Sequence, residues 1–178
     1  MTDTITFQLA RIPTPMGVML IVTDDQGRLR ALDWESHTER MQRLLARHYG
    51  AGLRLAEAPA KGPVADKLRA YFAGDVAAID NIPTETAGTA FQRRVWAALR
   101  AIPAGETWSY GRLAAYIGRP EAVRAVGLAN GANPIGVVVP CHRVIGADGS
   151  LTGYGGGLER KTWLLDHEGA MFRRECAA

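Results

Sequence analysis

The chain has 178 residues, of which 47% are hydrophobic and 22% are charged, and its formal net charge is +3 at pH 7. This is the composition of a folded protein, and it excludes wholesale disorder, a collagen-like repeat and a coiled coil. No apolar run approaches the ~20 residues that cross a bilayer, and the first residues do not form a secretory signal. Its two cysteines are too few for a disulfide framework. We therefore expect a cytoplasmic protein with no membrane partner, folded as one domain or as two small ones.

The first half of the chain predicts a sheet with helices. Short segments rich in apolar and β-branched residues are separated by stretches containing Pro, Asp and Gly, as in an antiparallel meander. These segments are 5–10, 18–23 and 29–34. Apolar residues at helical spacing predict helices over 39–49 and 63–72. Residues 75–88 show no clear period, which predicts a linker to a mainly helical second half.

The second half opens on a helix over 90–101, which Thr89 can cap. Two short helices, over 109–117 and 121–130, then flank a turn that contains glycine and proline at 118–120. This pattern is shared by a helix-turn-helix and by an αα-corner that only packs on a core. The pattern alone does not separate the two.

The last part of the chain places a cysteine at the end of an apolar run. Residues 135–139 predict a buried strand, and Cys141 follows it after one proline. The stretch 146–157 is rich in glycine and predicts a loop and hairpin, and 158–168 predicts a last helix.

Arginine is more frequent than lysine, and many arginines fall in the second half of the chain. A guanidinium makes planar, bidentate contacts with phosphate that an ammonium does not. The bias therefore fits a nucleic-acid-binding face, and it equally fits a solvated arginine-rich surface. The residues concerned are Arg93, Arg94, Arg100, Arg112, Arg119, Arg124 and Arg143.

Cys141 and His142 are the first candidates for chemistry. A thiolate is a nucleophile, and neighbouring imidazole or cationic groups favour it. Adjacent side chains on an extended chain point to opposite sides, so this pair needs a turn, and Pro140 favours one. A cysteine at the end of an apolar run is either an inert core thiol or an activated nucleophile.

Glu168, at the end of the predicted last helix, could orient His142 and so complete a Cys–His–Glu relay. Glu168 could equally be an exposed carboxylate at a helix end, and His167 could serve in its place. Cys176 lies in a charged tail and is expected to be an incidental thiol. Two distant cysteines and four scattered histidines match no zinc spacing, so no metal site is expected.

Pro140-Cys141-His142-Arg143-Val144 is similar to the active-site signature of the O6-alkylguanine-DNA alkyltransferases, also called methylated-DNA–protein-cysteine methyltransferases. The resemblance covers residues 89–169, with its motifs in order and at the expected spacing. These motifs include Thr89-Ala90-Phe91-Gln92, Ser109-Tyr110-Gly111, Arg124-Ala125-Val126-Gly127, Asn133-Pro134, Gly153-Tyr154 and Trp163-Leu164-Leu165. The first half resembles the constitutive bacterial (Ogt-like) members, notably at Pro15-Met16-Gly17 and through residues 66–74.

The resemblance implies an α+β fold in two parts. Residues 1–88 are expected to form a scaffold domain with a linker, built as a ribonuclease-H-like antiparallel sheet with helices. Residues 89–178 are expected to form a helical domain of the winged helix-turn-helix type, which binds DNA and carries the active-site cysteine. No nuclease carboxylate cluster is recognisable in the first part.

The resemblance also implies a reaction. The family transfers an alkyl group from O6 of guanine, or O4 of thymine, in duplex DNA to its own cysteine, here Cys141, once per chain. Water and His142 are expected to relay the thiol proton towards Glu168, Asn133 to brace the active-site turn, and Tyr110 to donate a proton to the leaving guanine. No cofactor, metal or obligate protein partner is implied, and we expect a monomer.

DNA contacts follow from the same resemblance. The damaged nucleotide must rotate out of the duplex, and Arg124 is expected to fill the gap from the minor groove. Tyr110 and small residues of the second short helix are expected to lie against the DNA. The small residues are Ala125, Gly127 and Ala129, with Ala122 and Gly131. Phosphate contacts are expected from Arg93, Arg94, Arg112 and Arg119.

The flipped base is expected to stack on Tyr154. The rest of the expected substrate pocket consists of Gly155, Gly156, Lys161 and Val139. Gly155 stands where many members carry serine or alanine, which could leave room for larger alkyl groups.

Three alternative functions differ from this one in sequence or in reaction. Damage-binding relatives replace the nucleophile, whereas position 141 is cysteine. Regulators activated by self-methylation carry an additional cysteine-rich domain, for which this chain is too short. A cysteine hydrolase built on Cys141, His142 and Glu168 would turn over many times, so counting events per chain separates it from an alkyltransferase.

Overall fold

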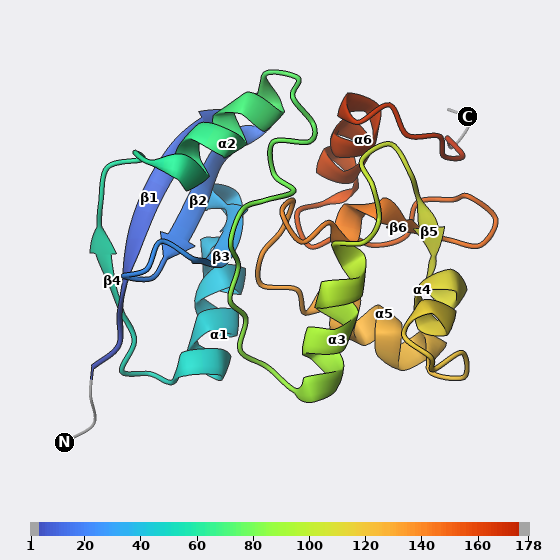
Figure 1. The fold of residues 1–178 in the computed structure, drawn as a ribbon, viewed down its shortest axis with the longest axis horizontal. Coiled ribbons are helices and arrows are strands. Elements are labelled where there is room, and N and C mark those ends of the chain that lie inside the picture. Colours follow the sequence, from blue (N-terminus) through green and yellow to red (C-terminus); the bar gives the residue numbers. More distant parts are fainter. Residues whose placement is uncertain (1–3, 175–178) are drawn as a thin grey trace. The chain divides into compact units, whose positions relative to one another are not determined.

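The computed structural model describes residues 4–174, so Cys176 lies outside the described residues. The chain divides into two compact units. The first contains the chain up to Gly88 together with Pro134–Val138, and the second contains Thr89–Asn133 and the chain from Val139 onward (Figure 1). Among residues 4–174, no helix is long and apolar enough to cross a membrane.

The first unit contains a four-stranded sheet in the order β3-β2-β1-β4. Its strands are β1 (Thr6–Thr14), β2 (Gly17–Thr23), β3 (Leu29–Trp34) and β4 (Arg54–Glu57). β1, β2 and β3 form the predicted antiparallel meander, whereas β4 pairs with β1 in parallel and makes the sheet mixed. β4 escaped prediction because it is short and mostly exposed, with only Leu55 partly buried.

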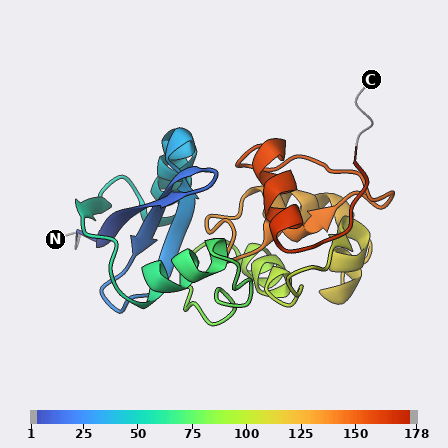
Figure 2. The same cartoon turned by 90° about the horizontal axis from the view of Figure 1, so that it is seen from above.

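Two helices cover the sheet of the first unit. They are α1 (Thr38–Tyr49), which follows the short η1 (Glu35–His37), and α2 (Pro63–Phe72). The strands lie between α1 and α2 (Figure 2). Met19, Leu20, Ile21 and Val22 of β2 are consequently all buried, because successive strand residues point to opposite faces and both faces are covered.

The second unit is mainly helical (Figure 1). Its elements are α3 (Ala90–Leu99), β5 (Trp108–Ser109), α4 (Tyr110–Tyr116), α5 (Val123–Gly131), η2 (Cys141–Arg143), β6 (Val144–Ile145) and α6 (Leu158–His167). Thr89 caps α3 as predicted, in a reciprocal pair of hydrogen bonds with Gln92. α5 packs against α3 and α4. The buried indole of Trp96 in α3 donates to the Ala129 carbonyl in α5 at 2.8 Å, which fixes these two helices together.

The predicted strand over 135–139 is wrong. Ile135 forms a single bridge with Leu32 of β3, after which the chain reverses. Val137 has φ 67°, and the Val138 N–H donates to the Gly136 carbonyl at 2.8 Å in a three-residue turn. A β-branched residue rarely adopts this left-handed conformation. The run is apolar because the turn is buried, not because it forms a strand.

Candidate active site and DNA-binding helix

Cys141 lies at the end of a tight turn. Pro140, at φ −83° and ψ 66°, is the centre of an inverse γ-turn in which the Cys141 N–H donates to the Val139 carbonyl at 2.8 Å. Nδ2 of the buried Asn133 donates to the same carbonyl at 2.7 Å. Asn133 therefore holds the peptide that precedes the cysteine. Cys141 itself is buried, with 6% of its surface exposed.

His142, Arg143 and Glu168 form a buried network beside the cysteine. The η2 turn places both His142 and Arg143 in the interior, and Glu168 is the C-cap of α6. Nε2 of His142 lies 2.9 Å from Oε1 of Glu168. Arg143 donates to both carboxylate oxygens of Glu168, and its Nη1 donates to the Ile102 carbonyl at 2.6 Å. The unit thus contains an imidazole, a carboxylate and a guanidinium in direct contact and away from solvent.

The electrostatics of this network determine which nitrogen of His142 carries a proton. Burial acts to raise the pKa of Glu168, but the attraction and hydrogen bond of His142 and the hydrogen bond of Arg143 outweigh it and hold that pKa well below its usual range. Burial also lowers the pKa of His142, against the opposing charge of Glu168, so the imidazole is neutral. An ionised carboxylate only accepts hydrogen bonds, so Nε2 is the protonated nitrogen.

Nδ1 of His142 is consequently the basic nitrogen. It is buried and has no hydrogen-bond partner among residues 4–174. The arrangement is that of a general base oriented by a carboxylate. His167, the other candidate, instead stacks on Trp163 with ring centroids 4.7 Å apart. Glu168 and not His167 is therefore the partner of His142.

Lys161 of α6 is a buried cation in the same unit. Its Nζ donates to the Val144 carbonyl at 2.7 Å and to the Thr152 carbonyl at 3.1 Å. Burial lowers the pKa of Lys161 from 10.5 to about 8, while the charge of Cys141 acts to raise it. The attraction is mutual, so an ammonium at this place favours a thiolate on Cys141.

Tyr110 begins α4, and its hydroxyl lies 2.7 Å from the hydroxyl of Thr152. Its ring lies beside α5, since a methyl group built on Gly127 would be 3.8 Å from the ring. The second of the two short helices and the segment before α6 are thus both in contact with Tyr110.

The residues of α5 divide into an exposed and a buried face. Arg124, Ala125 and Leu128 are exposed, and Leu128 has 71% of its surface accessible. Gly127 is half-buried, as expected of a residue near the edge of the face. Ala129 is 3% exposed, and its carbonyl accepts from Trp96 of α3, so its side chain offers little surface to DNA.

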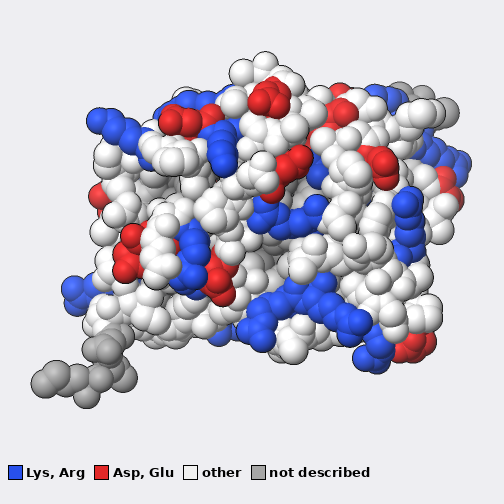
Figure 3. All heavy atoms as spheres, in the orientation of Figure 1, with Lys and Arg blue, Asp and Glu red and all other residues white. Residues whose placement is uncertain are grey.

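The four arginines predicted to contact phosphates are all exposed. Arg93 and Arg94 of α3 are exposed, and Lys and Arg side chains gather over that helix (Figure 3). Arg112 and Arg119 are also exposed, and the Arg112 guanidinium lies over the Trp108 ring at 4.5 Å. Arg143, which the charge bias had grouped with them, is 2% exposed and cannot reach a phosphate.

The expected pocket residues come from three places. Tyr154, Gly155 and Gly156 belong to the turn before α6, in which the Gly157 N–H donates to the Tyr154 carbonyl at 3.0 Å. Tyr154 and Gly155 are half-buried and Gly156 is buried. Lys161 comes from α6, and the buried Val139 precedes the Cys141 turn.

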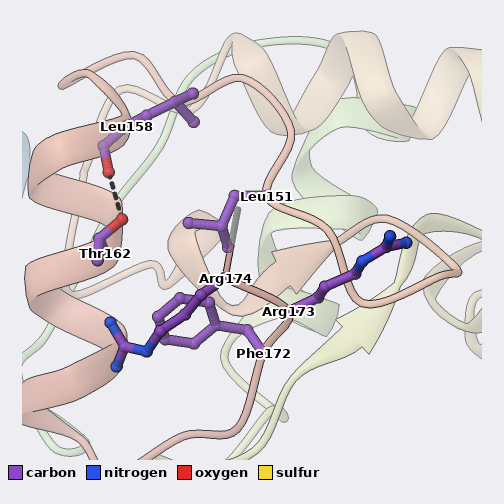
Figure 4. A pocket seen from close by; sticks show the side chains of 6 residues that line it. All are labelled: Leu151, Leu158, Thr162, Phe172, Arg173 and Arg174. Atoms are coloured by element: carbon purple, nitrogen blue, oxygen red, sulfur yellow. Dashed lines mark hydrogen bonds between the residues drawn. The ribbon is translucent and has the colours of Figure 1, made fainter. Parts of the chain in front are cut away.

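A separate cavity of about 300 Å³ lies between α6 and the segment that follows it (Figure 4). It is lined by Leu151, Leu158, Thr162, Phe172, Arg173 and Arg174. None of the predicted site residues lines it. Both arginines are already engaged, Arg173 with Asp148 and Arg174 with Asp166.

Sequence reasoning missed two residues of the site. Arg143 stands inside the signature next to His142, so its position was a signal that went unused. Thr152 has no local signal, because it is 42 residues from the tyrosine that it contacts. Within the described part of the chain, no group of three or more His, Cys, Asp or Glu could hold a metal ion.

The fold and the site together define a class of protein. One unit contains a sheet, and the other, helical unit carries a buried cysteine that is followed by a histidine oriented as a general base. Comparison with known proteins agrees with this class. The family model for the 6-O-methylguanine DNA methyltransferase ribonuclease-like domain matches residues 9–86, and the model for its DNA binding domain matches residues 90–170. The chain belongs to the 6-O-methylguanine DNA methyltransferase family, so both the sequence resemblance and the α+β fold are confirmed.

Individual relatives are similar over nearly the whole chain. A methylated-DNA–protein-cysteine methyltransferase of Salmonella typhimurium is 58% identical over 162 residues, which cover 90% of this chain and 95% of the relative. The Shigella flexneri protein of the same name is 55% identical over the same coverage. The crystal structure of Mycobacterium tuberculosis OGT in complex with DNA is 42% identical, with a TM-score of 0.75 over 90% of this chain and 92% of that one.

Proposed function

We propose that this protein repairs duplex DNA directly, by irreversible transfer of a methyl or larger alkyl group from O6-alkylguanine to Cys141. O4-alkylthymine is a second substrate of the same reaction. Each chain accepts one group and acts in the cytoplasm as a monomer, without an obligate protein partner. The observation that carries the proposal is the buried contact of Glu168 with His142, the residue that directly follows Cys141. Both residues lie in a unit that matches a DNA-binding family model.

The nucleophile is prepared by His142. Its unprotonated Nδ1 takes the thiol proton of Cys141 through one water molecule, and its Nε2–H stays bonded to Glu168. The expectation from sequence carried this proton on towards Glu168. The low pKa of that carboxylate argues against such a transfer, so Glu168 orients His142, and His142 holds the proton while the thiolate reacts. The Lys161 ammonium favours the thiolate that remains.

The transfer forms one bond and breaks another. The Cys141 sulfur forms a bond to the alkyl carbon, while the bond from that carbon to guanine O6 breaks and its electron pair stays on the base. Tyr110 donates its phenol proton to the departing guanine and is later reprotonated from solvent. The product thioether has no easily expelled group, and this limits each chain to one event.

The exposed face of α5 is the DNA-reading surface of this proposal. Arg124 projects from it and fills the gap left by the rotated nucleotide. Ala125 and Gly127 allow close approach to a narrow minor groove, which distinguishes base pairs poorly and so suits a protein that scans any sequence. The exposed arginines over α3 and α4 contact phosphates. Tyr154 stacks on the rotated base, with Gly155, Gly156, Lys161 and Val139 around it.

Intact-mass measurement tests the proposal. The protein is mixed with an excess of duplex oligonucleotide containing O6-methylguanine, and peptides are mapped afterwards. One added methyl group per chain, on the peptide containing Cys141, is the expected result. Continuing release of product beyond one event per chain would favour a cysteine hydrolase. Cys141→Ala should accept no label and still bind the alkylated duplex; a labelled variant would show that the nucleophile is misassigned.

A further inference from the structure

We infer that Thr152 is a positioning residue for the alkyl transfer, holding the phenol of Tyr110 in place for its proton donation. The inference rests on the proposed function and adds to it a residue outside the sequence signature. Two separate contacts carry it, one made by the side chain of Thr152 and the other by its main chain.

The side-chain contact joins the hydroxyls of Thr152 and Tyr110 at 2.7 Å, in a partly buried setting. Tyr110 is the first residue of α4, whereas Thr152 lies in the irregular segment before α6. Rotation about χ1 would move the Tyr110 hydroxyl, so a hydrogen bond from a second segment restrains where that hydroxyl lies.

The main-chain contact holds Thr152 itself. The carbonyl of Thr152 accepts from Nζ of Lys161 at 3.1 Å, and the same ammonium donates to the Val144 carbonyl at 2.7 Å. Lys161 is fully buried in α6, so this segment is fixed from a helix and not only by its own turn. The charge of Lys161 also interacts with Cys141. Lys161 and Thr152 therefore link the nucleophile, Cys141, to the proton donor, Tyr110.

The direction of the hydroxyl contact explains how it assists the reaction. Either hydroxyl can donate. When Thr152 donates to the Tyr110 oxygen, the phenol proton remains available for the leaving guanine. Negative charge grows on the Tyr110 oxygen as that proton departs, and a hydrogen bond to a charged acceptor is stronger than one to a neutral acceptor. The contact therefore strengthens in the transition state, which is the condition for acceleration.

The decisive variant is Thr152→Val, which keeps the shape of the side chain and removes the hydroxyl. Single-turnover rate constants are measured with O6-methylguanine duplex and with free O6-benzylguanine, in which guanine needs a proton as it leaves. Iodomethane is the reference reagent: Cys141 displaces iodide, and iodide needs no proton. We expect Thr152→Val to slow both guanine reactions about tenfold and to leave the iodomethane reaction unchanged. Thr152→Ser should restore the guanine reactions.

Thr162→Val is the matched control. Thr162 lies in α6 of the same unit, and its hydroxyl donates only along its own helix, to the Leu158 carbonyl at 2.9 Å. This variant should leave all three rates unchanged. A double-mutant cycle adds a second readout, because Thr152→Val should have no further effect in the Tyr110→Phe variant.

Two results would overturn the inference. Equal slowing of the guanine and iodomethane reactions would show that Thr152 acts on the thiolate or on the fold. Unchanged guanine rates in Thr152→Val would show that its hydroxyl has no part in the reaction. If the wild-type protein gained no group from either guanine substrate while iodomethane still labelled Cys141, the proposed function itself would fail, whatever the variants did.

Discussion

Arg143 donates a hydrogen bond to each carboxylate oxygen of Glu168, with Nε 2.9 Å from Oε2 and Nη2 2.8 Å from Oε1. This bidentate contact lies in the interior, and it supplies the positive charge that Glu168 needs there. Because Arg143 balances that carboxylate, His142 can remain neutral while bonded to it. The relay is therefore supported by a fourth residue that follows the histidine in the chain.

Glu168→Gln should reduce the free energy of unfolding by about 3–5 kcal/mol, because it leaves the Arg143 charge buried without its counter-ion. Urea denaturation at pH 7 measures the change. Asp66→Asn is the control: Asp66 pairs with Arg69 at the exposed surface, where such a pair contributes about 0–1 kcal/mol. A loss in Glu168→Gln no larger than in the control would contradict the interpretation of the network.

Stability should fall on acidification in two steps. Burial lowers the pKa of His142 from 6.5, so the unfolded state binds more protons as pH falls below that value and the folded state loses stability. The pKa of Glu168 is lowered from 4.5, so its contribution is present above that pH and is lost progressively below it. His142→Asn should flatten the pH dependence of the urea midpoint between pH 6.5 and 4.5. The step below pH 4.5 should become smaller but remain, because Arg143 still lowers the pKa of Glu168. An unchanged profile in this variant would mean that His142 is not neutral in the fold.

The transfer rate should decline above pH about 8, where Lys161 loses its charge and the thiolate loses a favourable neighbour. Lys161→Met should react more slowly at pH 7 and show no such decline. Rate constants with free O6-benzylguanine between pH 6 and 10 measure both effects. The same pKa, lowered from 10.5, means that the unfolded state binds more protons between pH 8 and 10.5, so wild-type stability should rise through that window. A decline that persisted in Lys161→Met would exclude this lysine as its cause.

Arg124→Ala should slow the repair of duplex DNA by at least tenfold (about 1.4 kcal/mol) and leave the reaction with free O6-benzylguanine nearly unchanged, because a free base needs no rotation out of a stack. Arg47→Ala, which removes an exposed arginine from α1 in the other unit, is the control and should alter neither rate. Equal losses on both substrates would argue against the gap-filling role of Arg124.

Leu128 should contribute to DNA affinity by apolar contact. It lies one helical turn after Arg124 on the exposed face of α5, with 71% of its surface accessible. Proteins of the minor groove often use such apolar side chains against the bases. Leu128→Ala should weaken duplex binding several-fold without changing the slope of log affinity against log salt, because leucine releases no counterions. Leu158→Ala, an exposed leucine of α6, is the control; equal binding by both variants would remove Leu128 from the interface.

Elements with a strong local signal were predicted closely. The helix over Pro63–Phe72 and the Thr89 cap were both predicted, because apolar periodicity and capping chemistry act over a few neighbouring residues. The run 135–139 was assigned wrongly for the opposite reason. Nothing local indicates that Val137 adopts a left-handed conformation, since valine disfavours it, and only the surrounding packing enforces it.

The sequence by itself determined the chemistry that is written locally: a thiol next to an imidazole, a capped helix, an arginine on a short helix and the family to which these motifs belong. Only the tertiary structure decided which distant groups meet them. It selected Glu168 over His167, buried Arg143 against that carboxylate, turned Ala129 away from solvent and brought Thr152 to Tyr110. The reason is physical: side-chain contacts between residues far apart in the chain depend on how complete helices pack, and no short stretch of sequence encodes that packing.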